Sequence, residues 1–155
     1  MNAYVFQEES KLIKKLKKQH ENILFLFKNL SSFIEGKDIS KTNCMLTLLN
    51  LRNELVKHLA LEDKELYPAL NKSKDKEIKR VSKKFSKEME DISKVAIDFF
   101  NNYSNLKVEE LDNEKKFKKE IAALKDAVVL RVELEEKILY PLYSKNPLST
   151  EAEKK

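Results

Sequence analysis

The stretch His58-Leu-Ala-Leu-Glu-Asp-Lys-Glu-Leu-Tyr-Pro68 has a second copy later in the chain, Arg131-Val-Glu-Leu-Glu-Glu-Lys-Ile-Leu-Tyr-Pro141. The glutamate and the closing Leu-Tyr-Pro recur at one constant offset: Glu62, Leu66, Tyr67 and Pro68 match Glu135, Leu139, Tyr140 and Pro141. The first copy carries His-x-x-x-Glu, which places an imidazole and a carboxylate one turn apart on one helix face, as a pair of metal ligands requires. In the second copy an arginine replaces the histidine, so half of that ligand pair is lost.

The composition around these copies predicts long helices. The chain has 155 residues with one Gly, three Pro and no Trp, which suits one domain with few tight turns. One cysteine, Cys44, cannot form an internal disulfide, and we find no segment like a signal peptide. We therefore expect a protein of the reducing cytoplasm.

The charge pattern indicates a solvated helical surface. The net charge is +5, but nearly all cations are lysines that alternate with acidic residues, and three arginines are present. This pattern does not favour a nucleic-acid partner. No run of about twenty apolar residues is present, so we expect no membrane partner either.

Apolar residues at 3–4 spacing predict four amphipathic helices over residues 6–33, 41–70, 74–103 and 114–143. Short connections between them favour an all-α, antiparallel up-down-up-down four-helix bundle built from two repeated helical hairpins. We assign the bundle to residues 1–145 and a polar, disordered tail to residues 146–155.

The same spacing predicts which side chains point inward. In the last helix the inward stripe continues from Glu135 to Ile138 and Leu142, whereas Tyr67 and Tyr140 are expected to pack the end of the bundle. The pseudo-twofold symmetry of the repeat would gather the inward polar residues at one level: His20, His58, Glu62, Met89, Arg131 and Glu135.

Two hairpins that each carry a His and then His-x-x-x-Glu-Glu-x-x-Leu-Tyr/Phe-Pro are the pattern of hemerythrin-like (HHE cation-binding) domains. The chain resembles this family from about Phe6 to Tyr143. The resemblance implies a bundle that holds two irons and handles dioxygen, nitric oxide or redox signals. It also implies a set of metal ligands: His20, His58, Glu62 and Glu135. Met89 and Arg131 stand where the family has the two histidines of its second half, which puts the second iron in question.

Three interpretations of this inward cluster are open. One metal, iron or another divalent cation, is held by the two histidines and one or two carboxylates. Alternatively, no metal binds, and Arg131 bridges Glu62 and Glu135 within a buried hydrogen-bond network. In the third, a histidine and Arg131 turn to solvent. The metal-free network is favoured, because a guanidinium repels a nearby cation.

With its iron pair broken, the domain is expected to be a regulatory, sensing or cation-binding protein and not an enzyme. The alternative is a metal-free bundle that binds a transcription protein. A second resemblance suggests this, to the bacterial regulator-of-sigma-D (Rsd/AlgQ-type) anti-sigma proteins. It rests on Arg131-x-x-x-Glu135-Glu136 and on Ile97-Asp98-Phe99-Phe100. Both a monomer and a homodimer are compatible with either function.

Overall fold

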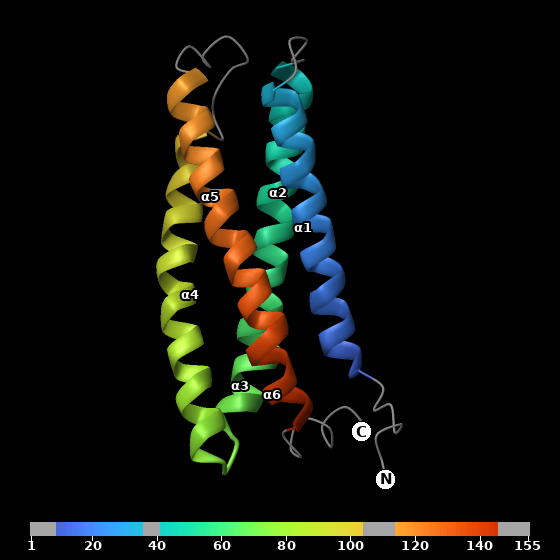
Figure 1. Cartoon of the computed structure of the whole chain (residues 1–155), viewed down its shortest axis with the longest axis vertical. Helices are drawn as coiled ribbons and strands as arrows, with labels where there is room; N and C mark the ends of the chain where they lie inside the picture. The colour runs from blue at the N-terminus through green and yellow to red at the C-terminus, as the bar shows by residue number, and fades with distance from the viewer. Residues whose placement is uncertain (1–8, 36–40, 104–113, 146–155) are drawn as a thin grey trace.

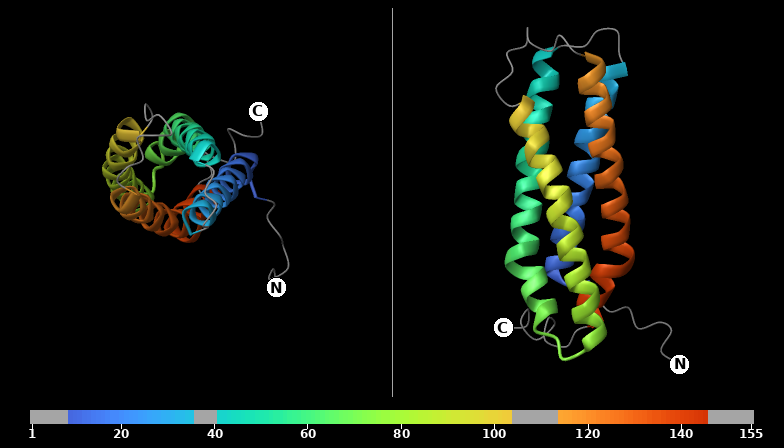
Figure 2. Two further views of the ribbon diagram at one scale, coloured as in Figure 1. Left: turned by 90° about the horizontal axis from the view of Figure 1, so that it is seen from above. Right: turned by 90° about the vertical axis from the view of Figure 1, so that its left-hand side faces the viewer.

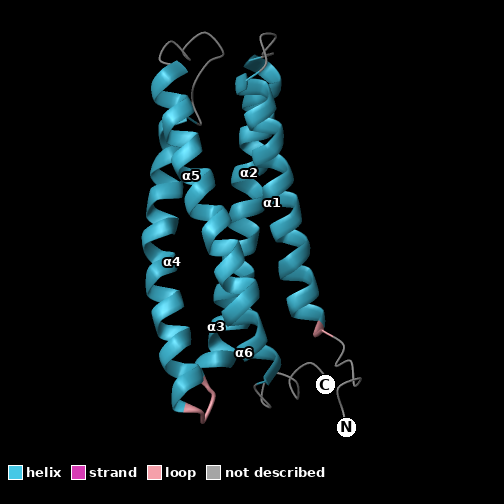
Figure 3. Ribbon diagram, in the orientation of Figure 1, coloured by secondary structure: helices cyan, strands magenta, loops and turns pink. Residues whose placement is uncertain are grey.

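Four helical segments run antiparallel along one axis in the computed structural model, which describes residues 9–35, 41–103 and 114–145 (Figure 1). They are α1 (Lys11–Glu35); α2 (Lys41–Leu61) with the π-helical turn η1 (Glu62–Leu66) and α3 (Tyr67–Asn71); α4 (Lys76–Tyr103); and α5 (Glu114–Leu134) with the π-helical turn η3 (Glu135–Leu139) and α6 (Tyr140–Lys145). Viewed along the axis, α1, α2, α4 and α5 follow one another around a ring (Figure 2). The predicted all-α four-helix bundle is confirmed, and the described ranges contain helices and short loops alone (Figure 3).

The helix starts differ slightly from the prediction, and local capping explains where they lie. α1 begins at Lys11 because Oγ of Ser10 accepts a hydrogen bond of 3.1 Å from the backbone N–H of Ile13. α4 begins after Asp75, whose Oδ1 accepts a 2.8 Å bond from the N–H of Glu77. The expected connections at 36–40 and 104–113 and the expected tail at 146–155 lie outside the described residues.

The two copies of the repeated stretch form the same local structure. In η1 the N–H of Tyr67 bonds to the carbonyl of Glu62, and in η3 the N–H of Tyr140 bonds to the carbonyl of Glu135. Each bond spans five residues, so each turn holds one residue more than an α-helical turn would. A proline follows each tyrosine and lacks the N–H that would continue the regular pattern.

The apolar interior is divided into two clusters with a polar layer between them. The upper apolar cluster, toward the top of Figure 1, reaches the polar layer at Ile23, Leu55, Ala96, Val128 and Val132. The lower apolar cluster reaches it from below at Leu16, Leu66, Phe85 and Leu139. The polar layer is therefore enclosed by packed apolar side chains along the bundle axis. Among the described helices, none is long and apolar enough to cross a membrane.

Candidate metal centre

Five polar or charged side chains make up the polar layer: His20, His58, Glu62, Arg131 and Glu135. Each is exposed by only 1–4%. They come from α1, α2, η1, α5 and η3, so the fold brings together residues far apart in the sequence. This burial contradicts the interpretation in which a histidine and Arg131 turn to solvent.

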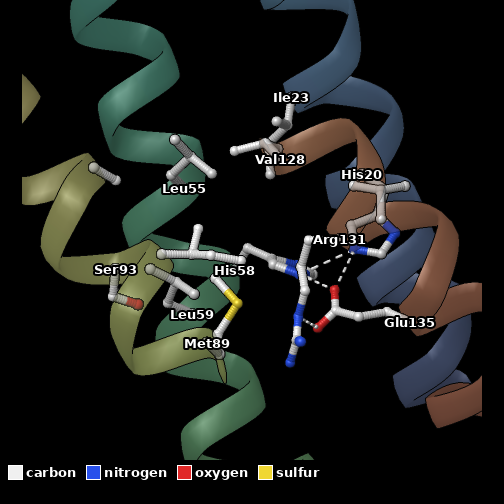
Figure 4. A pocket seen from close by; sticks show the side chains of 13 residues that line it. His20, Ile23, Leu55, His58, Leu59, Met89, Ser93, Val128, Arg131 and Glu135 are labelled. Carbon is white, nitrogen blue, oxygen red and sulfur yellow. Dashed lines mark hydrogen bonds and ion pairs between the residues drawn. The ribbon is translucent and has the colours of Figure 1, made fainter. Parts of the chain in front are cut away.

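Three potential ligand atoms converge inside this layer (Figure 4). Nε2 of His20 lies 3.1 Å from Nε2 of His58 and 3.0 Å from Oε1 of Glu135. Nε2 of His58 lies 3.4 Å from the same oxygen. The ligand atoms of these three residues all lie within 4.8 Å of one another, a spacing from which they could hold one metal ion.

The Nδ1 atoms of both imidazoles, which point away from the convergent atoms, already have hydrogen-bond partners. Nδ1 of His20 lies 2.8 Å from Oε2 of Glu136, and Nδ1 of His58 lies 2.9 Å from Oε1 of Gln19. Carboxylate and amide oxygens accept hydrogen bonds, so each Nδ1 must carry the hydrogen. In the neutral form of the two rings, the Nε2 atoms therefore face each other with lone pairs. This is how the partners outside a metal site orient histidine ligands.

Glu62 lies next to this group and is joined to it by Tyr140. The Tyr140 hydroxyl donates a 3.1 Å hydrogen bond to Oε2 of Glu62 and lies 3.1 Å from Nε2 of His20. Oε1 of Glu62 is 3.4 Å from Nε2 of His58, but it has no hydrogen-bond partner. Oε2 of Glu135 is likewise buried and unpartnered. Such buried acceptors are costly unless a cation or a proton reaches them.

The two carboxyl groups have opposite pKa shifts. Burial, together with the charge of Glu135, raises the pKa of Glu62 well above its ordinary value. Burial alone would also raise the pKa of Glu135, but the interactions of its carboxylate with the adjacent His20, His58 and Glu62 side chains outweigh burial and hold that pKa below the ordinary range. Burial lowers the pKa of His58, which favours its neutral, metal-binding form.

Arg131 does not bridge the two carboxylates, which corrects the sequence-based interpretation. Its Nη2 donates hydrogen bonds to the Tyr67 hydroxyl and to the backbone carbonyl of Phe85, and its Nη1 reaches Glu88. The guanidinium carbon lies 4.5 Å from the centre of the Phe85 ring. Its Nε is 3.7 Å from Oε2 of Glu135 without a hydrogen bond. The fork therefore points away from the ligand atoms toward α4.

A small cavity adjoins the convergent atoms on the side of the upper apolar cluster (Figure 4). The volume of this cavity is about 20 Å³, which is enough for a ligand of one or two atoms. Met89 and Ser93 of α4 line it together with His20, His58 and Leu59. Met89 therefore lies where the symmetry of the repeat predicted an inward residue.

The sequence patterns missed four residues around this centre: Gln19, Glu136, Tyr67 and Tyr140. Gln19 and Glu136 are immediate neighbours of His20 and Glu135, on helix edges that the apolar spacing does not single out. Tyr140 is five residues beyond Glu135, which in an α-helix would lie about 140° away. The extra residue of η3 returns it to the face of Glu135. The feature of the sequence that could have identified Tyr67 and Tyr140 is the tyrosine that precedes each repeated proline.

The family comparison agrees with this geometry. Residues 10–143 match the model of the hemerythrin HHE cation binding domain. Searches of curated proteins and of solved structures returned no match. The matched segment contains the whole polar layer and both π-helical turns. The chain therefore belongs to the family of hemerythrin HHE cation binding domains.

Proposed function

We propose that the chain binds one divalent cation between His20, His58 and Glu135, with Glu62 beside them. In this proposal it acts as a sensing or regulatory protein and not as an enzyme. The observation that carries the proposal is the convergence of two imidazole lone pairs and a carboxylate oxygen within 3.0–3.4 Å. These acceptors repel one another unless a positive charge lies among them. Two imidazoles with carboxylates suit iron, zinc and similar metals.

The residues fit one cation and not the pair that the family resemblance implies. The second half of the repeat supplies a thioether and a guanidinium, Met89 and Arg131, in place of two imidazoles. The guanidinium is anchored to Tyr67 and Phe85, so it is a fixed positive charge 3.7 Å from Glu135. A second cation at that position would be repelled. Arg131 nevertheless leaves the ligand atoms of the first position free.

The small space beside the ligand atoms is the basis for proposing a sensing role. When bound, the cation would supply a Lewis-acidic centre next to the 20 Å³ cavity. That cavity suits a ligand of one or two atoms, the size of a diatomic gas. The buried free thiol of Cys44 is consistent with a reducing, cytoplasmic setting, which is part of the proposal.

Metal content tests this proposal. Protein from iron-replete cells, or reconstituted anaerobically, should carry about one iron per chain, the capacity of one such ligand set. Its absorption should change on adding nitric oxide. His20→Ala should abolish the iron, whereas Lys57→Ala, an exposed change next to His58, should retain it. Parent protein that stays metal-free after reconstitution would refute the proposal.

A second candidate is a metal-free protein-binding bundle, and the surface of α2 favours it. Leu46, Leu49 and Val56 share one face of that helix and are 40–57% exposed. Such a stripe is a common feature of partner-binding surfaces. Under this candidate the parent would contain no iron, would capture a transcription protein such as a sigma factor, and would lose that capture in Leu49→Lys.

A further inference from the structure

Two surface clefts flank the polar layer, and they carry opposite charges. The lysine cleft, between α1 and α2, is lined by four lysines and one acid: Lys15, Lys18, Lys57, Lys64 and Glu54. The acidic cleft, between α2–η1 and α4, is lined by three acids and one lysine: Glu62, Asp63, Glu90 and Lys94. The volume of the acidic cleft is about 250 Å³, which leaves room for a cation with bound waters.

The acidic cleft adjoins the cavity beside the ligand atoms. Leu59, Met89 and Ser93 line both spaces, so these three side chains lie at the boundary between the cleft and the cavity. Figure 4 shows Met89 and Ser93 on α4 opposite Leu59 and His58 on α2. The lysine cleft shares no lining residue with that cavity. It reaches Gln19, and therefore the side of His58 on which Nδ1 carries a hydrogen.

Glu62 links the acidic cleft to the ligand atoms. Its side chain is 99% buried and lines the cleft, and its Oε1 has no hydrogen-bond partner although it lies 3.4 Å from Nε2 of His58. An unpartnered buried carboxylate oxygen is an acceptor for an arriving cation. Asp63 and Glu90 are exposed and stand at the mouth of the same cleft.

We infer that the acidic cleft is the route by which the cation enters, with Asp63 and Glu90 attracting it and Glu62 receiving it. A cleft lined by one sign of charge raises the local concentration of the opposite ion and its rate of association. Met89 and Leu59 form the inner barrier, and the unbranched methionine side chain changes rotamer easily. This inference rests on the proposed cation site, and it assigns a role to Asp63 and Glu90, which lie outside that site.

The rate of Co²⁺ uptake tests the route separately from the site. Co²⁺ is followed by stopped-flow absorption, with the parent and two double variants of equal charge change. Asp63→Asn with Glu90→Gln should slow uptake about tenfold at low ionic strength. Added salt should shrink that difference, because it screens exposed charges. Glu21→Gln with Glu54→Gln removes two negative charges on the side of the molecule that carries the lysine cleft. This variant should leave the rate of uptake within about twofold of the parent.

A steric variant tests the passage itself. Ser93→Leu enlarges a half-buried side chain at the boundary between cleft and cavity. It should slow uptake and release by the same factor and leave the affinity for Co²⁺ unchanged, since a barrier does not alter the end states. Ser86→Leu, in the cleft but not in the cavity, is its control and should have a smaller effect.

The outcomes separate the two proposals. If the parent binds no Co²⁺ at equilibrium, the cation site and the route both fail. If the parent binds Co²⁺ but both charge variants slow uptake equally, the rate follows net charge and the acidic cleft is not the route. Unchanged rates in the Asp63/Glu90 variant overturn the inference as well, while the cation site stands.

Discussion

The hydroxyl of Tyr140 donates a 3.1 Å hydrogen bond to Oε2 of Glu62 and so joins the second copy of the repeat to the first across the bundle. Burial raises the pKa of Tyr140 far above its ordinary value, so the hydroxyl keeps its hydrogen. In the absence of a cation, the surrounding acceptors share the hydrogen of this hydroxyl.

Tyr140→Phe should therefore lower the free energy of unfolding of the metal-free protein by about 1–3 kcal/mol, because a buried acceptor is left unsatisfied. Chemical denaturation followed by circular dichroism measures the change. Tyr103→Phe, on a half-buried ring outside the polar layer, should cost less than about 1 kcal/mol. Equal losses in both variants would mean that the bond to Glu62 contributes nothing.

Arg131→Ala should destabilise the metal-free fold by about 3–5 kcal/mol. The change removes a buried cation near Glu135 and leaves the Tyr67 hydroxyl and the Phe85 carbonyl without their donor. Thermal melts compare it with Arg52→Ala, an exposed position where a change below about 0.5 kcal/mol is expected. A loss under about 1 kcal/mol at Arg131 would show that its buried contacts are not stabilising.

Deleting Lys137 should leave the bundle folded. Lys137 is exposed inside η3, and its removal turns the π-helical turn into an ordinary α-helical one, with Glu135 and Tyr140 still on one face. Deleting Asp126, also exposed but within regular α5, rotates Leu124 and Val128 about 100° relative to each other and should abolish cooperative unfolding. Unfolding curves of the two deletions give the comparison. Equal damage would contradict the role of the extra residue.

The helical turns around η3 also mark where prediction from the sequence fails. The four helices, the bundle and the inward level of His20, His58 and Glu135 follow from regular 3–4 spacing, and the structure bears this out. Beyond Glu135 the regular spacing predicts Ile138 as an inward residue, yet Ile138 is 43% exposed and Leu139 is buried. The inserted residue of the π-helical turn shifts the register, and apolar spacing does not report such an insertion.

The orientation of Arg131 could not be predicted from the sequence, for a different reason. Its helical position predicts that it points inward, and it does. The acceptors of its guanidinium N–H groups include the Phe85 carbonyl and the Tyr67 hydroxyl, which lie on two other segments of the chain. Those partners are known only once the helices are packed, so the predicted bridge to Glu62 and Glu135 was wrong.

The Cys44 thiol should react slowly with iodoacetamide in the native protein. Burial raises the pKa of this thiol above its ordinary value, and the thiolate is the reactive form. Because the pKa is raised in the folded state, the unfolded state loses the proton first. The contribution to stability is therefore full below the unfolded pKa and is lost as pH rises above it. Alkylation at neutral pH with and without denaturant, read by mass spectrometry, tests the burial. Equal rates would contradict it.

The pair Met89→His and Arg131→His should convert the domain to one that holds two irons. Both side chains line the cavity beside His20 and His58, so the new imidazoles would start from inward positions. The double change supplies both missing ligands and removes the fixed guanidinium that repels a second cation. Neither change suffices alone. Met89→His keeps the repelling charge, and Arg131→His leaves the second position one imidazole short, so the effects on iron uptake should be strongly non-additive.

Iron per chain after anaerobic reconstitution is the measurement for this pair, with the near-ultraviolet absorption of an oxo-bridged ferric pair as a second readout. Met89→Leu with Arg131→Met is the matched control, because it removes the same side chains without adding ligands. Circular dichroism establishes that each variant is folded. A folded His/His variant that takes up no more iron than the control would mean that the two halves of the repeat do not place these positions around a second cation. The assignment of Met89 and Arg131 as replaced ligands would then be wrong, whereas the cation position at His20, His58 and Glu135 would be judged by the iron content of the parent.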